Sequence, residues 1–223
     1  MISLYLLTTP GREESLAATL RELAACDWGE PPRIIRDSGA PSDWALARGH
    51  LEVLRRALAD AASHFLILED DLRIARHLRH NLERWPPLQR GGLHFATLYN
   101  PGLRESSRAE PRSGAVEGPG AINPALPTAS GALPESGPAW FAADPPACFG
   151  GQARIFSREC AAFILEKMPG PGLQQDPQMA RLAAQLGPLW VHMPSLVQHT
   201  GRTSTWSATF HEAIDFDPEW RAE

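Results

Sequence analysis

The chain has 223 residues, of which 43% are hydrophobic and 21% charged, and its formal net charge is −5. This length suits one domain with a real hydrophobic core, and the acidic balance excludes a strongly basic nucleic-acid binder. No apolar run approaches the roughly 18–20 residues of a membrane-spanning helix, and the three cysteines form no CxxC pair that would indicate a zinc site or a disulfide framework. The N-terminal apolar run lacks a basic leader, so we expect a cytoplasmic protein without a secretory signal.

The first hundred residues predict strands that alternate with helices. Short apolar runs predict strands over residues 2–8, 33–36 and 64–68, and helical spacing of leucine and alanine predicts helices over 13–25 and 44–62. The run over 64–68 is continuously apolar, which is typical of a central strand covered on both faces. This alternation predicts an α/β fold with a mostly parallel sheet.

A different composition follows over residues 100–147, which contain nine prolines and six glycines. We expect a long loop insertion there, because the segment has no clear periodicity. Regular structure is predicted to return as a strand over 151–156, helices over 158–168 and 177–186, and a strand over 189–197.

Three consecutive carboxylates, Glu69, Asp70 and Asp71, follow the predicted central strand. Two unit charges about 4 Å apart repel by roughly 4 kcal/mol at an effective dielectric constant near 20, so such a cluster needs a cation or ample solvent. Mg²⁺ and Mn²⁺ prefer carboxylate oxygens, and ligands of open α/β sheets bind at the carboxyl ends of the strands. The alternative is a solvated acidic turn at the start of a helix over 72–85.

The motif LILEDDL, residues 66–72, resembles the acidic motif of GT-A fold glycosyltransferases, and its ILEDD form is most similar to the lipooligosaccharide type. Three other segments resemble the family in the same order: TTPGR over 8–12, CFGGQA over 148–153 and PSLVQHTG over 194–201. The resemblance implies a GT-A-like three-layer α/β/α sandwich with a mostly parallel central sheet. It also implies a single domain over residues 1–223.

The resemblance implies a role for each residue of the acidic motif. Asp71 would be the main carboxylate on Mn²⁺ or Mg²⁺, and His199 would ligate the same ion. Glu69 would contact the ribose or a metal-bound water, and Asp70 would support its neighbours. For His199, the alternative is a core histidine bonded to a backbone carbonyl.

A nucleotide-sugar donor is the second implied ligand. The resemblance assigns the first loop to the base, an acid after the second strand to the base or ribose, and a glycine loop to the sugar. Thr8, Thr9 and Arg12 belong to the first loop, and Asp37 is the acid after the second strand. Gly150 and Gly151 belong to the glycine loop.

Arginine dominates the basic residues, because only Lys167 among the 21 is a lysine. Coding bias in a GC-rich genome explains such a composition. Arginines that bind phosphate through their planar fork are the functional alternative. Arg48 and Arg202 are the candidates, with an ordinary surface position as the alternative for each.

Asp176 corresponds to the carboxylate that the family places at a helix start facing the acceptor. It would act as the general base that takes the proton from the attacking hydroxyl in an inverting transfer. Its other interpretation is a helix N-cap, because Pro177 follows at what would be the first helical position. Both roles are compatible with each other.

The predicted function is a metal-dependent glycosyltransferase that moves a sugar from a nucleotide-diphosphate sugar, expected to be a UDP-sugar, to an acceptor hydroxyl. The acceptor could be a glycan, a lipid-linked sugar, a protein or a modified nucleic acid. One alternative is a phosphohydrolase or nucleotidyltransferase using the same carboxylates, although GxGxR and DxDxT motifs are absent from the sequence. Another is a non-catalytic domain that binds nucleotide-sugars.

Overall fold

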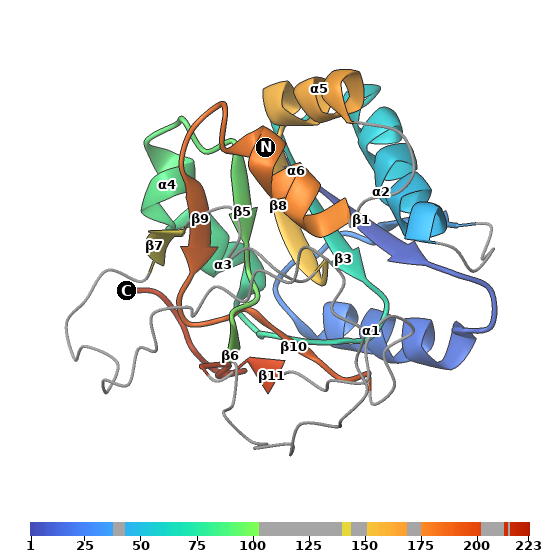
Figure 1. Cartoon of the computed structure of the whole chain (residues 1–223). Coiled ribbons are helices and arrows are strands. Elements are labelled where there is room, and N and C mark those ends of the chain that lie inside the picture. Colours follow the sequence, from blue (N-terminus) through green and yellow to red (C-terminus); the bar gives the residue numbers. More distant parts are fainter. Residues whose placement is uncertain (38–42, 103–139, 144–150, 169–174, 202–211, 214) are drawn as a thin grey trace, which may run out of the picture.

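A mixed sheet of seven strands lies at the centre of the computed structural model (Figure 1). The structure describes residues 1–37, 43–102, 140–143, 151–168, 175–201, 212–213 and 215–223. The strands lie in the order β2-β1-β3-β8-β5-β9-β7. In that order their bounds are Arg33–Arg36, Ile2–Thr8, His64–Glu69, Ala153–Ser157, Phe95–Thr97, Leu189–His192 and Trp140–Ala143.

The strand directions confirm the α/β class and correct the expected sheet. Strands β1, β2, β3, β5 and β9 run one way, whereas β8 and β7 run antiparallel to their neighbours. The expectation of a mostly parallel sheet is therefore wrong, since half of the neighbouring pairs are antiparallel. All five residues of β8 are buried, as in a central parallel strand, so its apolar sequence does not reveal its direction.

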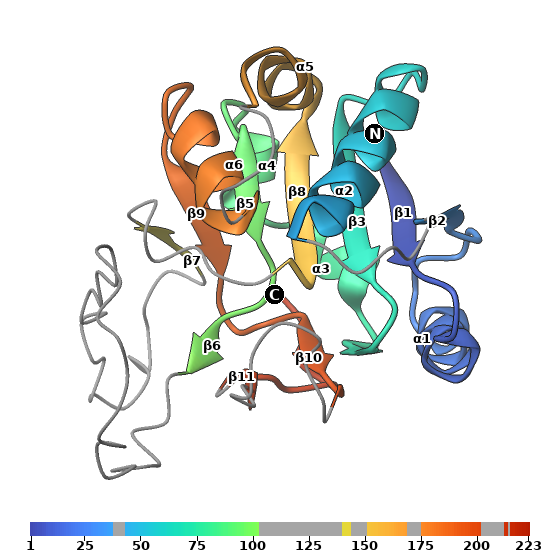
Figure 2. The same cartoon turned by 45° about the vertical axis from the view of Figure 1, so that its right-hand side comes forward.

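Helices cover both faces of the sheet and complete a three-layer α/β sandwich (Figures 1 and 2). One face carries α2 (Asp43–Leu58), α5 (Arg158–Lys167) and α6 (Gln175–Ala183), whose apolar residues share a buried cluster with the strands. The other carries α1 (Glu13–Ala25) and α3 (Leu78–Glu83), which share a second cluster. A single-turn helix, α4, spans Pro86–Gln89.

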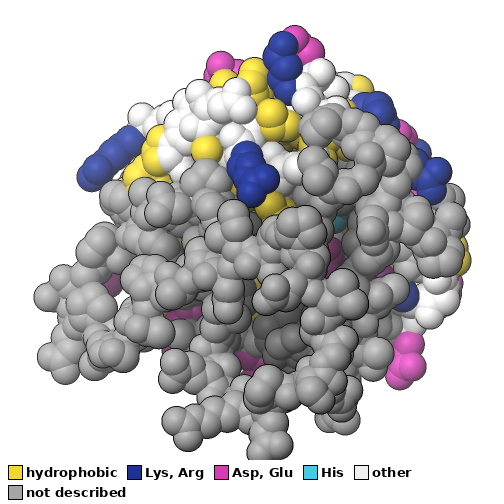
Figure 3. All heavy atoms as spheres, viewed as in Figure 1, with side chains coloured by type: hydrophobic (Ala, Val, Ile, Leu, Met, Phe, Trp, Pro, Cys, Tyr) yellow, Lys and Arg dark blue, Asp and Glu magenta, His cyan; other side chains and the backbone are white. Residues whose placement is uncertain are grey.

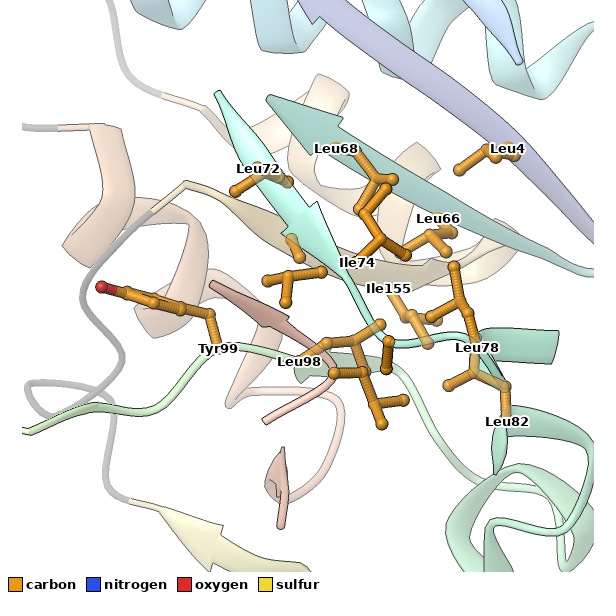
Figure 4. Packing of buried hydrophobic residues seen from close by; sticks show 14 of the residues in the cluster. Leu4, Leu66, Leu68, Leu72, Ile74, Leu78, Leu82, Leu98, Tyr99 and Ile155 are labelled. Atoms are coloured by element: carbon orange, nitrogen blue, oxygen red, sulfur yellow. The ribbon is translucent and has the colours of Figure 1, made fainter. Parts of the chain in front are cut away.

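Strand β3 contributes to both hydrophobic clusters because successive side chains of a strand point to opposite faces. Leu66 and Leu68 belong to the cluster that contains Leu78 and Leu82 of α3 (Figure 4). Ile67, between them, belongs to the cluster under α2 and α5. Complete burial of one such side chain contributes about 1.5–3 kcal/mol, so β3 is a strong anchor for the acidic residues that follow it.

Two small antiparallel ribbons lie beyond the end of the sheet at the bottom of Figure 1. In one, β4 (Leu72–Ile74) pairs with β10 (Val197–His199), and in the other β6 (Pro101–Gly102) pairs with β11 (Glu212–Ala213). The first ribbon opposes His199 to Leu72. It therefore brings the histidine next to the acidic segment, although 128 positions separate His199 from Asp71 in sequence.

Three predicted segments differ from the structure. Residues 72–74 form β4 instead of the start of a helix, because their backbone pairs with β10. The predicted strand over 189–197 is divided into β9 and the beginning of β10. Within the expected loop over 100–147, residues 101–102 and 140–143 form β6 and β7, and β7 pairs with β9 at the edge of the sheet. Residues 103–139 and 144–147 lie outside the described part.

Charged side chains of both signs are interspersed over the upper part of the surface in Figure 3. Some form exposed pairs within a helix, such as Arg56 Nε with Glu52 Oε1 at 2.8 Å on α2. Among the described residues, no helix combines the length and the apolar character needed to cross a membrane.

Candidate functional site

The acidic segment Glu69–Asp71 lies at the carboxyl end of β3, beside the end of β1, where Leu7 pairs with Glu69. Thr19 of α1 fixes the turn into β4. Its hydroxyl donates to Asp70 O at 2.8 Å and accepts from Leu72 N at 3.0 Å, and its side chain is fully buried. These two hydrogen bonds hold the turn that carries Asp70 and Asp71 against α1.

Asp70 is buried and has partners on both carboxylate oxygens. The Thr8 hydroxyl donates to Oδ2, and Arg12 Nε donates to Oδ1 at 2.7 Å. Burial raises the pKa of Asp70, and the hydrogen bonds and charge supplied by Thr8 and Arg12 partly oppose that shift. Asp70 is therefore held in place by the end of β1 and the loop after it.

Asp71 is 8% exposed, and only one of its two carboxylate oxygens has hydrogen-bond partners among the described residues. Arg12 Nη2 donates to Oδ2 at 2.5 Å, and His199 Nε2 lies 3.2 Å from the same oxygen. Burial acts to raise the pKa of Asp71, but His199 and Arg12 outweigh it and lower the pKa overall. Oδ1 is buried and accepts no hydrogen bond from the described residues, so it is an acceptor available to a ligand.

Asp71 and His199 could together supply two ligands to a divalent cation. No group of three or more His, Cys, Asp or Glu side chains in the described ranges could hold a metal ion. Ions such as Mg²⁺ are often held by one or two carboxylates together with substrate phosphates, so two protein ligands and the available Oδ1 are compatible with that mode.

The loop after His199 packs tightly over this pair. The backbone N–H of Thr200 donates to Asp71 O at 2.8 Å. A Cβ on Gly201 would lie 2.6 Å from Asp71 Oδ2 and 2.8 Å from His199 Nε2, so the packing requires glycine. The absence of a side chain at Gly201 thus permits the close approach of the loop to both candidate ligands.

Glu69 lies on the other side of the cluster, against the glycine loop. A Cβ on Gly151 would lie 2.4 Å from Glu69 Oε1, so the carboxyl group occupies the space that a side chain would need. Burial, followed by the charges of Asp71 and Asp176, raises the pKa of Glu69 to about 8, while Arg154 opposes the shift. Burial and the neighbouring carboxylates thus favour the protonated form of Glu69, in which it can donate a hydrogen bond.

A buried arginine on β8 connects the predicted base to the sheet. Arg154 is 1% exposed, and its Nη2 lies 2.9 Å from Asp176 Oδ1. Its guanidinium carbon lies 5.9 Å from the centroid of the Phe95 ring. Helix α6 begins at Gln175, so Asp176 lies within the first turn and the N-cap interpretation is wrong. The Asp176 side chain is 33% exposed and remains accessible from solvent.

Sequence reasoning missed Arg154 and two further buried polar residues near Glu69. Gln152 O accepts from Glu69 N at 2.9 Å, and His50 Cε1 would be 3.5 Å from a Cβ on Gly151. Gln152 immediately precedes β8, and Arg154 is the second residue of that strand. The arginine within the strand predicted over 151–156 was the available indication, because a charged residue in a buried strand needs a partner.

The remaining predicted residues lie at varying positions relative to the acidic segment Glu69–Asp71. Thr9 follows the end of β1, and the backbone N–H of Asp37 donates to Thr8 O at 2.8 Å. Asp37 Oδ2 would be 3.1 Å from a Cβ on Gly49, which places it near the first half of α2. Arg48 is exposed on the same helix. The structure therefore gathers Thr8, Arg12, Glu69, Asp70, Asp71, Gly151 and His199, while Gly150 and Arg202 lie outside the described residues.

Comparison of the chain with models of known protein families and with curated proteins finds no match.

Proposed function

We propose that the chain is a metal-dependent glycosyltransferase of the GT-A type, with a nucleotide-diphosphate sugar, in the first instance a UDP-sugar, as donor. The observation that carries the proposal is the buried, available Oδ1 of Asp71, beside His199 and at the carboxyl end of β3. Open α/β sheets bind ligands at that edge, and a diphosphate would complete the coordination that two protein side chains begin.

Asp71 and His199 would hold Mn²⁺ or Mg²⁺, which would neutralise the charge that builds on the departing nucleoside diphosphate. Thr8, Thr9 and Asp37 surround the end of β1, where the base and ribose would lie. Gly151 has no side chain and so lets the Glu69 carboxyl group lie against the backbone of this loop, where it could contact the ribose or the sugar of the donor.

Asp176 would take the proton from the acceptor hydroxyl as the new glycosidic bond forms, which corresponds to inversion at the anomeric carbon. Support comes from its partial exposure and from its pairing with Arg154, which holds the carboxylate through Oδ1. Asp176→Ala should therefore lower kcat more than it changes KM for the donor.

The first measurement is titration of the full chain with UDP in the presence and absence of Mn²⁺. We expect binding that depends on Mn²⁺ and that is lost in Asp71→Asn and His199→Ala. Asp217→Asn, which changes an exposed carboxylate in the C-terminal tail, is the matched control and should bind as the unaltered chain does. Absence of binding to any nucleoside diphosphate would contradict the proposal.

Turnover of a panel of UDP-sugars, followed as UDP release with candidate acceptors, tests the reaction itself. Loss of either metal ligand should lower kcat/KM by about 10²-fold or more, the scale of one electrostatic contact to a transition state. Release of a sugar phosphate without an acceptor would indicate the hydrolase alternative. Metal-dependent UDP binding without any turnover would indicate a non-catalytic binding domain.

A further inference from the structure

Arg12 lies between the two aspartates of the acidic segment. Its Nε contacts Asp70 Oδ1 at 2.7 Å and its Nη2 contacts Asp71 Oδ2 at 2.5 Å, so one guanidinium spans both carboxylates. The Arg12 side chain is 31% exposed, whereas those of Asp70 and Asp71 are 4% and 10% exposed. The charge that stabilises this buried acidic pair is therefore supplied from the solvent side by a residue of the loop before α1.

This geometry places Arg12 in competition with any cation that binds Asp71. A guanidinium on Oδ2 neutralises part of the charge that would attract a divalent ion, and like charges a few ångströms apart repel. The buried Oδ1 of Asp71 has no hydrogen-bond donor among the described residues, so a second cation would have an acceptor to approach. Arg12 therefore opposes metal binding at Asp71 unless it moves or is neutralised by an anion.

We propose that Arg12 is a displaceable internal cation that couples divalent-metal binding to phosphate binding. Without metal it holds Asp70 and Asp71 together. When a metal ion binds Asp71, the Nε contact to Asp70 keeps Arg12 attached, and its freed Nη2 pairs with a phosphate oxygen of the nucleotide. The inference rests on the proposed function in taking Asp71 and His199 as the metal ligands and a nucleoside diphosphate as the anion.

The proposal can be measured because it links the binding equilibria of Mn²⁺ and UDP thermodynamically. If UDP draws Arg12 away from Asp71, UDP must tighten Mn²⁺ binding, and Mn²⁺ must tighten UDP binding by the same factor. In Arg12→Gln the competing charge is absent, so Mn²⁺ alone should bind roughly 10-fold more tightly than to the unaltered chain, and the extra gain from UDP should shrink by a similar factor.

The experiment is Mn²⁺ titration of the full chain, with and without UDP, following the free-ion signal by electron paramagnetic resonance. Arg56→Gln removes a positive charge from an exposed pair on α2 and is the matched control, which should behave as the unaltered chain. Arg12→Lys keeps the charge but loses the planar fork that spans two carboxylates, so an intermediate Mn²⁺ affinity is expected. This variant also serves as the test if Arg12→Gln does not fold.

Two results would overturn the inference: an Mn²⁺ affinity that is unchanged or weaker in folded Arg12→Gln, or no Mn²⁺ binding to any variant. If only Arg12→Lys folds, an Mn²⁺ affinity equal to or lower than that of the unaltered chain would also overturn the inference. Tighter Mn²⁺ binding in Arg12→Gln without UDP binding to any variant would sustain the competition between Arg12 and the metal, but it would overturn the coupling to phosphate and contradict the proposed function.

Discussion

Among individual residues, Arg154 and Asp176 form an ion pair with one buried and one partly exposed member. Arg154 lies beside Phe95 and Met179 on the covered face of β8, whereas the Asp176 side chain is 33% exposed. A charge left in apolar surroundings is much more costly than one that can turn to water. Removing the carboxylate should therefore be more damaging to the fold than removing the arginine.

We expect Asp176→Asn to lower the free energy of unfolding by about 3 kcal/mol, because it takes the carboxylate away from a buried guanidinium. Arg154→Met should cost less than about 1 kcal/mol, since an apolar side chain suits the same surroundings and Asp176 can be hydrated. Urea unfolding at pH 7 compares the two, with Asp217→Asn as the control for loss of an exposed carboxylate. Equal costs for the two variants would contradict this account.

Among the elements, the junction between β3 and β4 carries Asp70 and Asp71. Thr19 ties that junction to α1 through one accepted and one donated hydrogen bond, and both are buried. A threonine hydroxyl on the apolar face of a helix is unusual unless it has partners of this kind. The helix therefore contributes to the site by holding the backbone on either side of Asp71.

Thr19→Val keeps the shape of the side chain but leaves Asp70 O and Leu72 N without their common partner. We expect a loss of about 1–3 kcal/mol in the free energy of unfolding, the range for an unsatisfied buried polar group. Thr19→Ser retains the hydroxyl and should lose less, and this comparison separates the hydrogen bonds from packing. Thermal and urea unfolding measure both variants, and a valine variant as stable as the serine variant would contradict the assignment.

Elements with a strong local pattern could be predicted from the sequence, and those that depend on distant pairing could not. Strand β3 and helix α5 match their predicted positions closely because apolar spacing and a buried run are local properties. Strand β4 has three residues and exists through its pairing with β10, while β7 is defined by its pairing with β9. Neither partner is indicated by the sequence of the segment itself.

In the candidate site, too, residues within local motifs could be predicted, whereas contacts between distant segments could not. The acidic residues and His199 were predicted from motifs, and the structure brings Asp71 and His199 to 3.2 Å. The contact of Arg12 with both aspartates was not predicted, because it joins the loop after β1 to the turn after β3. The roles of these residues in binding a metal or a donor stay predictions.

In the molecule as a whole, the C-terminal tail closes one side of the core over a buried histidine. The ring of His192 lies 4.9 Å from that of Trp85 and 5.5 Å from that of Trp220, centroid to centroid. Its Nδ1 lies 2.7 Å from Pro194 O, which can only accept, so Nδ1 carries the proton of the neutral ring. The Asn81 side chain donates to Trp220 O at 3.0 Å and holds the tail in place.

Burial lowers the pKa of His192 from 6.5 to about 4, and this shift makes the stability of the whole fold depend on pH. Between those values the unfolded chain binds the proton more readily than the folded chain, so acid favours unfolding. The contribution of His192 is complete above pH 6.5 and declines as the pH falls toward 4. Its total loss is about 3 kcal/mol, because one pKa unit corresponds to about 1.4 kcal/mol.

His192→Phe keeps an aromatic ring between Trp85 and Trp220 but cannot be protonated. We expect its free energy of unfolding to fall less steeply than that of the unaltered chain between pH 6.5 and 4, even if its stability at pH 8 is lower because the bond to Pro194 O is lost. Urea unfolding at several pH values measures the two slopes. Parallel curves for the two proteins would show that other groups cause the acid sensitivity, and that protonation of His192 does not open the contact between tail and core.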